Sequence, residues 1–554
     1  MSYSQRVISM DGTNAMDMQS LHSEDTRADP GCSNLNARRI RAFMEIDNAQ
    51  YSRFHWKVAL IAGIGFFTDA YNLFAIGIAS VMLGYVYGGE VLITPNSSSC
   101  HHNSIKDTNH ELAKNLDLSL KIAAPLGTFF GPVFFGWLAD MMGRKRMYGI
   151  ELMIIVIGSF GQAVSSGGQG INIFAVLIVW RVIMGFGIGG DYPSSAVIAS
   201  EFAPRAFRGR LMTAVFASQG FGQLCATVVA IVVTAAYKDS LRQNNNTNFE
   251  PLTVMWRILI GLGCVPGTIA LFFRLTIPET PRFTMDIERN IDQAIQDIDK
   301  FLKTGTFKID PDARIERVNA PRASFRDFKA YFSDRENFRV LFGCSYCWFV
   351  LDVAFYGLGL NSPVLLGDLF SVEGKPAYDQ LINIAKGNII LVCAGLLPGF
   401  ALCFLFIDRW GRKRLQYIGF AGSTVLFIIM GKPFSRSLKP FSSDRSQVLG
   451  EAFPTRYRST AHGIAASAGK LGAILAQLAF TKLKDRGGKN KAISHILEVY
   501  ALFTLTGCAA TWLIQETKDL SLEELSNEDQ DNFIKGRHSD HSLRYTYESN
   551  GHAL

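Results

Sequence analysis

Six ionisable side chains stand inside long apolar runs of this sequence. A charged group is costly in the hydrocarbon core of a membrane, so such residues typically face a protein interior or a water-filled path. They are therefore candidates for handling a proton or a polar solute. The six are Asp69, Glu151, Arg181, Asp191, Asp352 and Lys470.

Trp348, Asp352 and Tyr356 follow one another at four-residue spacing, so on a helix all three lie on one face. An indole N–H, a carboxyl group and a phenol are all potential hydrogen-bond donors, and the carboxyl donates only when it is protonated. That condition offers a physical route to coupling, in which a proton binds first and an anion next. The alternative is an aromatic packing stripe with one satisfied Asp.

Asp191 stands in the segment Gly189-Gly-Asp-Tyr-Pro193, at the end of an apolar run. A carboxylate there indicates either a role in proton movement or a structural ion pair, for which Arg181 is the candidate partner. Pro193 offers a break in the helix where freed backbone groups can serve as ligands.

Lys470 is a cation among small residues, in Ser467-Ala-Gly-Lys470. An unpaired buried Lys tends to lose its proton, so a partner anion or carboxylate is expected, and Asp69 is a candidate. Glu151 stands just inside a helix start beside a basic loop, where pairing with Arg or Lys is expected. Gln219 stands inside another apolar run, where a Gln between membrane helices is common interhelical glue.

Composition identifies the elements that must position these groups. The chain of 554 residues is 48% hydrophobic and 19% charged, whereas a soluble protein carries about a quarter charged residues. Apolar runs of roughly 20 residues, each able to cross a bilayer as a helix, recur along it. The fold class is therefore an all-α polytopic membrane protein. We expect eleven helices, at about 57–83, 117–139, 147–165, 171–195, 211–236, 256–276, 339–361, 385–407, 415–431, 459–480 and 495–514.

Polar segments divide the chain into five parts. Residues 1–56 are predicted to be a disordered N-terminal tail, 57–276 a half of six helices, 277–338 a central loop, 339–514 a second half, and 515–554 a C-terminal tail. Basic residues cluster in loops on one side, taken as cytoplasmic, and the net charge of +7 reflects these loops rather than nucleic-acid binding. The opposite loops carry sequons at Asn96 and Asn245, which are glycosylation candidates.

The two halves repeat each other. The run Asp140-Met-Met-Gly-Arg-Lys-Arg146 returns as Asp408-Arg-Trp-Gly-Arg-Lys-Arg414, and the run that begins at Glu201 returns at Glu451. Matched halves are typical of transporters that rock around a site near the membrane midplane. Glu201 follows Asp140 by 61 residues, whereas Glu451 follows Asp408 by 43, so the second half is 18 residues short. That shortfall is close to one membrane helix.

The shortfall falls on residues 432–449. This segment holds three basic residues and two prolines before residue 441, which makes a lipid-facing helix implausible. Parity sharpens the problem, because helix 415–431 should end outside whereas Arg456 and Arg458 favour the cytoplasm. The sequence therefore predicts that the tenth of twelve helices is missing.

These motifs resemble the major facilitator superfamily and, within it, the fungal and plant inorganic phosphate:proton symporters. The loop motif Gly136-Trp-Leu-Ala-Asp140-x-x-Gly143-Arg-Lys-Arg146 is superfamily-wide, and Gly189-Gly-Asp191-Tyr192-Pro193 is the symporter-like signature. Trp348-x-x-x-Asp352-x-x-x-Tyr356 and the run Gly450-Glu451-x-Phe-Pro to His462-Gly also match. The resemblance covers about residues 50–525, apart from 432–449, and implies the major facilitator fold.

The resemblance implies proton-coupled uptake of inorganic phosphate by alternating access, in a plasma membrane with both tails cytoplasmic. It implies phosphate contacts by Tyr192, Gln219, Trp348, Asp352, Tyr356 and Lys470. Proton coupling would fall to Asp69, Glu151, Asp191 and Asp352. Asp140, Arg144, Asp408, Arg412 and Glu451 would then belong to gate loops rather than to the ligand site.

The sequence departs from the family pattern at two places, and two other classes of function remain as alternatives. Many family members carry Asp at the position of Asn72, and the family's tenth helix supplies a phosphate-binding Asn that segment 432–449 cannot hold. A phosphate receptor that signals without transport is one alternative, and a porter of a sugar or glycerophosphodiester is the other. Enzyme chemistry, a cofactor and a metal are not expected, because the sequence has no nucleotide loop or metal cluster. We expect Cys344 and Cys347, inside a predicted helix, to serve packing.

Overall fold

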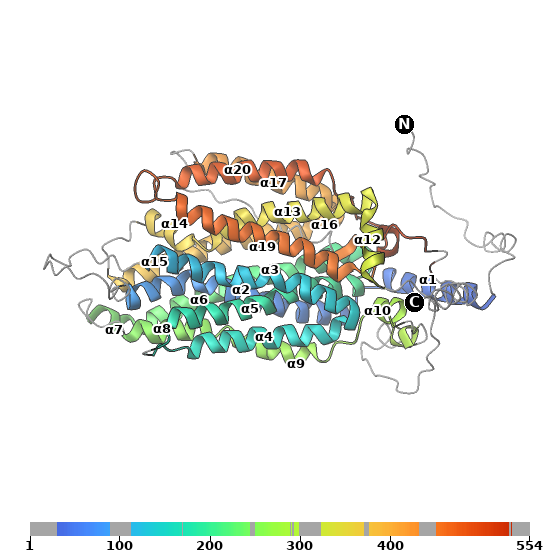
Figure 1. The fold of residues 1–554 in the computed structure, drawn as a ribbon, viewed down its shortest axis with the longest axis horizontal. Helices are drawn as coiled ribbons and strands as arrows, with labels where there is room; N and C mark the ends of the chain where they lie inside the picture. Colours follow the sequence, from blue (N-terminus) through green and yellow to red (C-terminus); the bar gives the residue numbers. More distant parts are fainter. Residues whose placement is uncertain are drawn as a thin grey trace, which may run out of the picture.

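The computed structural model describes residues 30–88, 112–168, 170–243, 250–288, 290, 293–298, 323–370, 376–431, 450–530 and 533. Within them the long helices run roughly side by side along one axis and form an elongated bundle (Figure 1). Eleven spans of these described residues are long and apolar enough to cross a membrane, which confirms the eleven predicted helices.

The first half contributes six spans and the second half five. The first six are α2 (Arg53–Tyr87), α3 (Lys114–Met142), α4 (Arg144–Val164), α5 (Ile173–Phe202), α6 (Arg208–Ala236) with the 3₁₀ turn η2 (Arg205–Phe207), and α8 (Glu250–Gly261) with α9 (Cys264–Arg274). The other five are α13 (Arg335–Gly359), α15 (Ala377–Leu391) with α16 (Leu397–Trp410), α17 (Arg412–Gly431), α19 (Arg458–Leu483) and α20 (Ile493–Thr511).

Two of the predicted helices are irregular inside. The predicted helix 256–276 is interrupted between α8 and α9, where a Cβ on Gly263 would collide with the amide oxygen of Asn72. The predicted helix 385–407 is longer and contains the π-helical turn η3 (Val392–Leu396) between α15 and α16. The sequence could not predict these irregularities, because hydropathy shows only the length of an apolar run. A local change in backbone hydrogen bonding does not alter that length.

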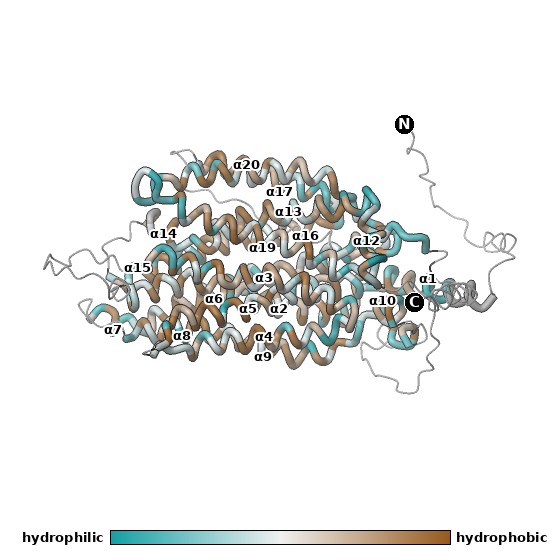
Figure 2. The backbone as a smooth tube through the Cα atoms, in the orientation of Figure 1, coloured by the Kyte–Doolittle hydropathy of each residue, from teal (hydrophilic) through white to brown (hydrophobic). Residues whose placement is uncertain are grey.

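Hydropathy along the backbone agrees with a membrane setting. Apolar colouring dominates the middle of the long helices, and hydrophilic stretches gather toward the two ends (Figure 2). Large apolar side chains such as Phe130, Phe272 and Leu502 are more than half exposed on the outer surface of the bundle. Such a surface is stable where lipid rather than water surrounds it.

Glycines set the closest helix contacts. A Cβ on Gly127 or Gly131 of α3 would collide with backbone oxygens of α5, and one on Gly463 of α19 would collide with the carbonyl oxygen of Pro132 in α3. Small residues allow membrane helices to pack backbone against backbone. The contact of α3 with α19 joins the first half to the second.

Shorter helices flank the spans. In the described part of the chain they include α1 (Pro30–Asp47), α7 (Lys238–Gln243), α10 (Pro281–Asp286), α12 (Phe325–Ser333), α14 (Ser362–Leu369) and α21 (Leu522–Leu525). Helix α1 lies in the stretch predicted to be a disordered tail, and this part of that expectation does not hold. Arg39 of α1 pairs with Asp286 of α10, with 2.7 Å between Nε and Oδ1. Local sequence cannot reveal a buried partner more than 200 residues away.

The predicted missing helix concerns segment 432–449, which lies outside the described residues. The residues that flank it stand at opposite ends of the bundle. Gly431 at the end of α17 packs against Ser494 and Glu498 at the start of α20, whereas the carbonyl oxygen of Gly450 accepts a hydrogen bond from Ser200 near the end of α5. Gly431 and Gly450 therefore lie at opposite ends of the bundle.

The packing of α3 against α5 predicts a stability difference between two glycine substitutions. Gly185→Ala places a methyl group against the carbonyl oxygen of Ala124, and such overpacking costs about 1–3 kcal/mol. Gly422→Ala in α17 is the matched control, because no atom lies within 4 Å of its added Cβ. Thermal unfolding of the detergent-purified protein should therefore show a lower midpoint for the first variant and an unchanged or higher midpoint for the second. Equal midpoints would contradict the close contact.

Candidate functional site

A cavity between the two halves collects all six residues predicted to contact an anion. Its lining combines Tyr192 of α5, Gln219 of α6, and Trp348, Asp352 and Tyr356 of α13 with Lys470 of α19. The remaining lining is apolar and consists of Phe216, Leu351, Phe355 and Phe400. An apolar wall with a few converging polar groups is the usual form of a small-ligand site.

Lys470 is the centre of this cavity. Its Nζ lies 2.9 Å from Oδ2 of Asp352 and donates a hydrogen bond to the hydroxyl of Tyr356 at 3.0 Å. The ammonium also lies 4.5 Å from the ring centroid of Tyr192 and 4.4 Å from that of Tyr356. The hydroxyls of these two tyrosines are 3.2 Å apart and join α5 to α13. The partner of Lys470 is therefore Asp352, which corrects the prediction of Asp69.

Trp348 closes one side of the cavity. Its ring stands edge-on to Tyr192, with centroids 6.2 Å apart, and edge-on to His462 at 5.2 Å. A Cβ on Gly469 would meet Trp348 Cδ1 at 2.6 Å and Asp352 Oδ2 at 2.9 Å. The small residue before Lys470 therefore allows α19 to approach the face of α13 that carries Trp348 and Asp352, and the aromatic face is part of a polar site.

Asp191 is held by a cation that the sequence interpretation did not identify. Its Oδ2 lies 2.7 Å from Nη2 of Arg274 at the end of α9, and its Oδ1 accepts a hydrogen bond of 2.6 Å from Ser195. The predicted partner, Arg181, donates instead to the carbonyl oxygen of Leu120 and to the side chain of Gln162. The sequence did not single out Arg274 because it lies at the end of an apolar run, where a basic residue commonly marks the end of a membrane helix.

Asp69 and Glu151 are buried close to this ion pair. Glu151 accepts a hydrogen bond of 2.8 Å from Ser194, and no salt bridge joins it to the basic residues that were its expected alternative partners among the described residues. Neither oxygen of Asp69 makes a hydrogen bond of ordinary geometry within the described part of the chain. Both carboxyl groups lie within electrostatic range of Asp191 and Arg274. Three buried carboxyl groups thus lie near one guanidinium, and Asp191 alone is bonded to it.

The expected break at Pro193 is absent, because α5 continues through this residue to Phe202. A proline inside a helix still removes one backbone hydrogen bond, because it has no N–H to donate to the carbonyl four residues earlier. The structure therefore shows a continuous helix at Pro193 rather than a break. Tyr192 and Asp191 nevertheless direct their side chains to different partners, Tyr192 to the cavity and Asp191 to Arg274.

Asn72 occupies the position at which many members of the resembled family carry Asp. Its side-chain amide donates to the carbonyl oxygens of Thr68 and Gly263, and its Oδ1 accepts from Ser159. A carboxylate has no hydrogen to donate to those carbonyls. The amide therefore serves the contact of α2 with α9 and α4.

The two repeated loop motifs lie together at one end of the bundle, here called the gate end. Asp140 accepts hydrogen bonds from the backbone N–H groups of Ser459 and Thr460 at the start of α19. In the second half, Asp408 accepts from the backbone N–H of Arg210 at the start of α6. Each half therefore caps the first turn of a helix that belongs to the other half.

Buried ion pairs reinforce both motifs. Glu201 binds Arg144 at 3.4 Å and Arg458 at 2.7 Å, and Glu451 binds Arg412 at 3.3 Å. None of the predicted gate residues lines the cavity. Glu279 and Glu516 complete the symmetry, because each accepts two backbone hydrogen bonds at the start of α4 or α17.

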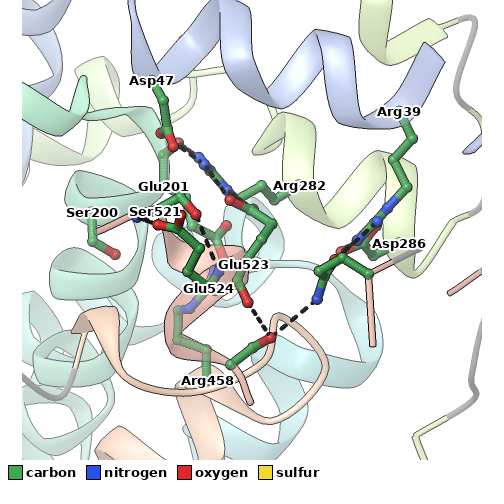
Figure 3. A network of polar contacts seen from close by, with 12 residues as sticks. Arg39, Asp47, Ser200, Glu201, Arg282, Asp286, Arg458, Ser521, Glu523 and Glu524 are labelled. Atoms are coloured by element: carbon green, nitrogen blue, oxygen red, sulfur yellow. Dashed lines mark hydrogen bonds and ion pairs between the residues drawn. The ribbon is translucent and has the colours of Figure 1, made fainter. Parts of the chain in front are cut away.

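A second layer covers the gate end, and we call it the latch (Asp47, Arg208, Arg282 and Glu523). Arg282 reaches both Asp47 and Glu523 (Figure 3), with nitrogen–oxygen distances of 3.0 and 2.8 Å. Arg208 pairs with Asp47 at 2.9 Å. The chain segments before the first span and after the last span are thereby tied to the loops between spans.

The opposite end carries a chain of polar contacts that reaches the cavity wall. Lys121 of α3 pairs with Asp117 and donates to the amide oxygen of Asn361 at 3.3 Å. Asn361 in turn donates to Gln477, whose amide donates to the carbonyl oxygen of Tyr356 at 2.7 Å. Polar contacts therefore join the two halves on both sides of the cavity.

The described residues contain no group of three or more side chains arranged to hold a metal ion. Cys344 and Cys347 are both buried in the apolar core, and neither forms a disulfide with a described cysteine. The sequons at Asn96 and Asn245 lie outside the described residues.

Comparison with solved structures identifies the fold. The proton:xylose symporter XylE bound to 6-bromo-6-deoxy-D-glucose matches with a TM-score of 0.63 at 20% identity, over 86% of this chain and 99% of that chain. An inward-open structure of the xylose transporter from E. coli matches with a TM-score of 0.54. The fold is therefore the major facilitator fold that the first of these structures represents.

Sequence comparison gives the family. A model described as "Sugar (and other) transporter" matches residues 58–441. A repressible high-affinity phosphate permease of Neurospora crassa is 42% identical over 532 residues, 89% of this chain and 90% of the relative. The inorganic phosphate transporter PHO84 of Saccharomyces cerevisiae is 39% identical over 530 residues, 88% of this chain and 87% of the relative. The chain belongs to the sugar (and other) transporter family.

The pair of Asp191 and Arg274 predicts a compensating double substitution. Removing one partner leaves a buried charge unpaired, at a cost of about 3–5 kcal/mol, whereas removing both charges costs much less. Arg274→Gln should therefore lower the thermal midpoint strongly, and Arg274→Gln combined with Asp191→Asn should recover most of the loss. If the decrease in thermal midpoint of the double variant equalled the sum of the decreases of the two single variants, this result would contradict the ion pair.

The latch predicts a defined response to acid. The guanidinium of Arg282 lowers the pKa of Glu523 to about 2 from its ordinary value near 4.5. Because the pKa of Glu523 is lower in the folded protein than in the unfolded chain, the ionised carboxylate stabilises the fold at any pH above the unfolded pKa. This contribution is lost as the pH falls below that pKa toward 2. Glu523→Gln should lower the thermal midpoint by the same amount at pH 7.5 and at pH 5.5. A difference that vanished at pH 5.5 would contradict the ion pair.

Proposed function

We propose that this protein takes up inorganic phosphate together with protons by alternating access. Two relatives that cover nearly the whole chain carry names as a phosphate permease and a phosphate transporter. The single observation that supports this function most is the cavity, where a buried ammonium is surrounded by hydrogen-bond donors from both halves. A phosphate anion has oxygens on every side and needs such a set of donors.

The Lys470–Asp352 pair supplies a mechanism for coupling. In the structure the ammonium is neutralised by the carboxylate at 2.9 Å. A proton on Asp352 would remove the charge that holds Lys470 and would convert the carboxyl group into a donor. Phosphate then replaces the carboxylate as counterion, with Tyr192, Gln219, Trp348 and Tyr356 as further donors. When phosphate leaves, Asp352 releases its proton and recovers Lys470.

The other part of the proposed proton path consists of Asp69, Glu151 and Asp191, which lie in the first half of the chain. Asp191 has Arg274 as its counterion, whereas Asp69 and Glu151 have no bonded cation among the described residues. Burial of an unpaired charge is costly, so these two positions are suited to hold exchangeable protons while Asp191 keeps Arg274 in place. The path would run on the first-half side of the cavity.

We infer that the gate end faces the cytoplasm, since it gathers the basic loops, and that the protein resides in the plasma membrane. The closed gate and the polar chain through Lys121 would then isolate the cavity from both sides. Rocking of the halves would break one set of contacts at a time.

The proposal is tested by expressing the protein in cells that lack phosphate uptake of their own and measuring the uptake of radiolabelled phosphate. The chain should take up phosphate, a protonophore should abolish the uptake, and excess xylose or glycerophosphodiester should not compete. Asp352→Asn should lower uptake about 10- to 100-fold, because a charge-assisted contact is lost.

Asp379→Asn is the matched control, since Asp379 belongs to an exposed ion pair with Arg242. This variant should transport normally. Absence of uptake by the unaltered chain would refute transport, and phosphate-dependent signalling without uptake would instead support a receptor.

A further inference from the structure

His462 is buried between the cavity and the gate, and the proposed mechanism does not use it. Its side chain has no solvent exposure, and neither ring nitrogen has a hydrogen-bond partner within the described residues. Its one aromatic neighbour in the described part is Trp348, which it meets edge-on. A buried polar group without partners destabilises a protein, so a phenyl ring would satisfy packing better.

The position of His462 on α19 places it in a row. Arg458, His462, Ala466 and Lys470 follow at four-residue spacing, so they lie along one slanting ridge of the helix with a rise of about 6 Å between successive positions. Lys470 belongs to the cavity and Arg458 belongs to the gate, where it binds Glu201. His462 therefore lies between two cations along the direction that links the cavity with the gate.

Trp348 and Asp140 bound this position on its two sides. Trp348 lies between the rings of Tyr192 and His462, so its indole separates His462 from the cavity. Toward the gate, Asp140 of α3 clasps Ser459 and Thr460. The charged groups nearby on α3, α5, α13 and α19 are bonded to partners other than the ring, namely Asp140, Glu201, Asp352, Arg458 and Lys470.

We propose that His462 is a transient binding site for phosphate between the cavity and the gate. A neutral imidazole offers one donor and one acceptor, and hydrogen phosphate offers acceptor oxygens together with a P–O–H donor. When Trp348 turns aside, the anion leaves Lys470, binds His462 and then meets Arg458 as the gate opens. The ring nitrogens lack partners among the described residues because their partner is the passing anion. This inference rests on the proposed phosphate transport.

Two substitutions separate this role from packing. His462→Phe keeps an aromatic ring against Trp348 and removes both nitrogens, whereas His462→Gln keeps a donor and an acceptor. Reconstituted into proteoliposomes, His462→Phe should lose about tenfold in net uptake and in phosphate–phosphate exchange, with unchanged phosphate binding from the side opposite the gate. His462→Gln should stay within about threefold of the unaltered protein. The thermal midpoint of His462→Phe should equal or exceed that of the unaltered protein, which excludes misfolding as the cause.

Three outcomes would overturn the inference or its basis. Normal exchange and uptake by His462→Phe would show that the ring serves packing alone. Loss of net uptake with intact exchange would assign His462 to proton movement, because exchange requires phosphate passage without net proton transfer. Absence of phosphate uptake by the unaltered chain would refute the proposed function. This result differs from failure of the His462 inference, because it is seen before any residue is substituted.

Discussion

A buried ammonium cannot remain in a membrane bundle without a counterion, and this constraint organises the centre of the molecule. Lys470 is almost fully buried, and Asp352 satisfies it from the neighbouring helix. The pairing requires α13 and α19 to approach closely, which Gly469 permits. It also holds Tyr356 where its hydroxyl meets Tyr192 of the other half. Packing, charge and the contact between halves therefore depend on one ion pair.

The two halves meet the cost of buried charge in different ways. The second half matches one cation with one carboxylate, Lys470 with Asp352. The first half places three carboxyl groups, Asp69, Glu151 and Asp191, around the single guanidinium of Arg274. Pseudo-symmetry in the backbone thus coexists with asymmetry in charge. The balanced pair is suited to exchange its counterion for an anion, and the acid-rich cluster is suited to carry protons.

The sequence predicts the features that depend on local patterns. Apolar runs gave the eleven spans, and four-residue spacing put Trp348, Asp352 and Tyr356 on one face. Partners of buried charges depend on tertiary contacts, so Asp191 pairs with Arg274 rather than with Arg181, and Lys470 pairs with Asp352 rather than with Asp69. Helix α1 is ordered by ion pairs with distant segments, which its polar composition does not reveal.

The reciprocal capping at the gate end has a consequence for how the molecule can move. Asp140 of the first half holds the start of α19, and Asp408 of the second half holds the start of α6. Separation of the halves at this end must therefore break both sets of hydrogen bonds, because each set joins one half to the other. Loss of one set makes the other easier to break, so the gate end favours a fully closed or a fully open arrangement over an intermediate one.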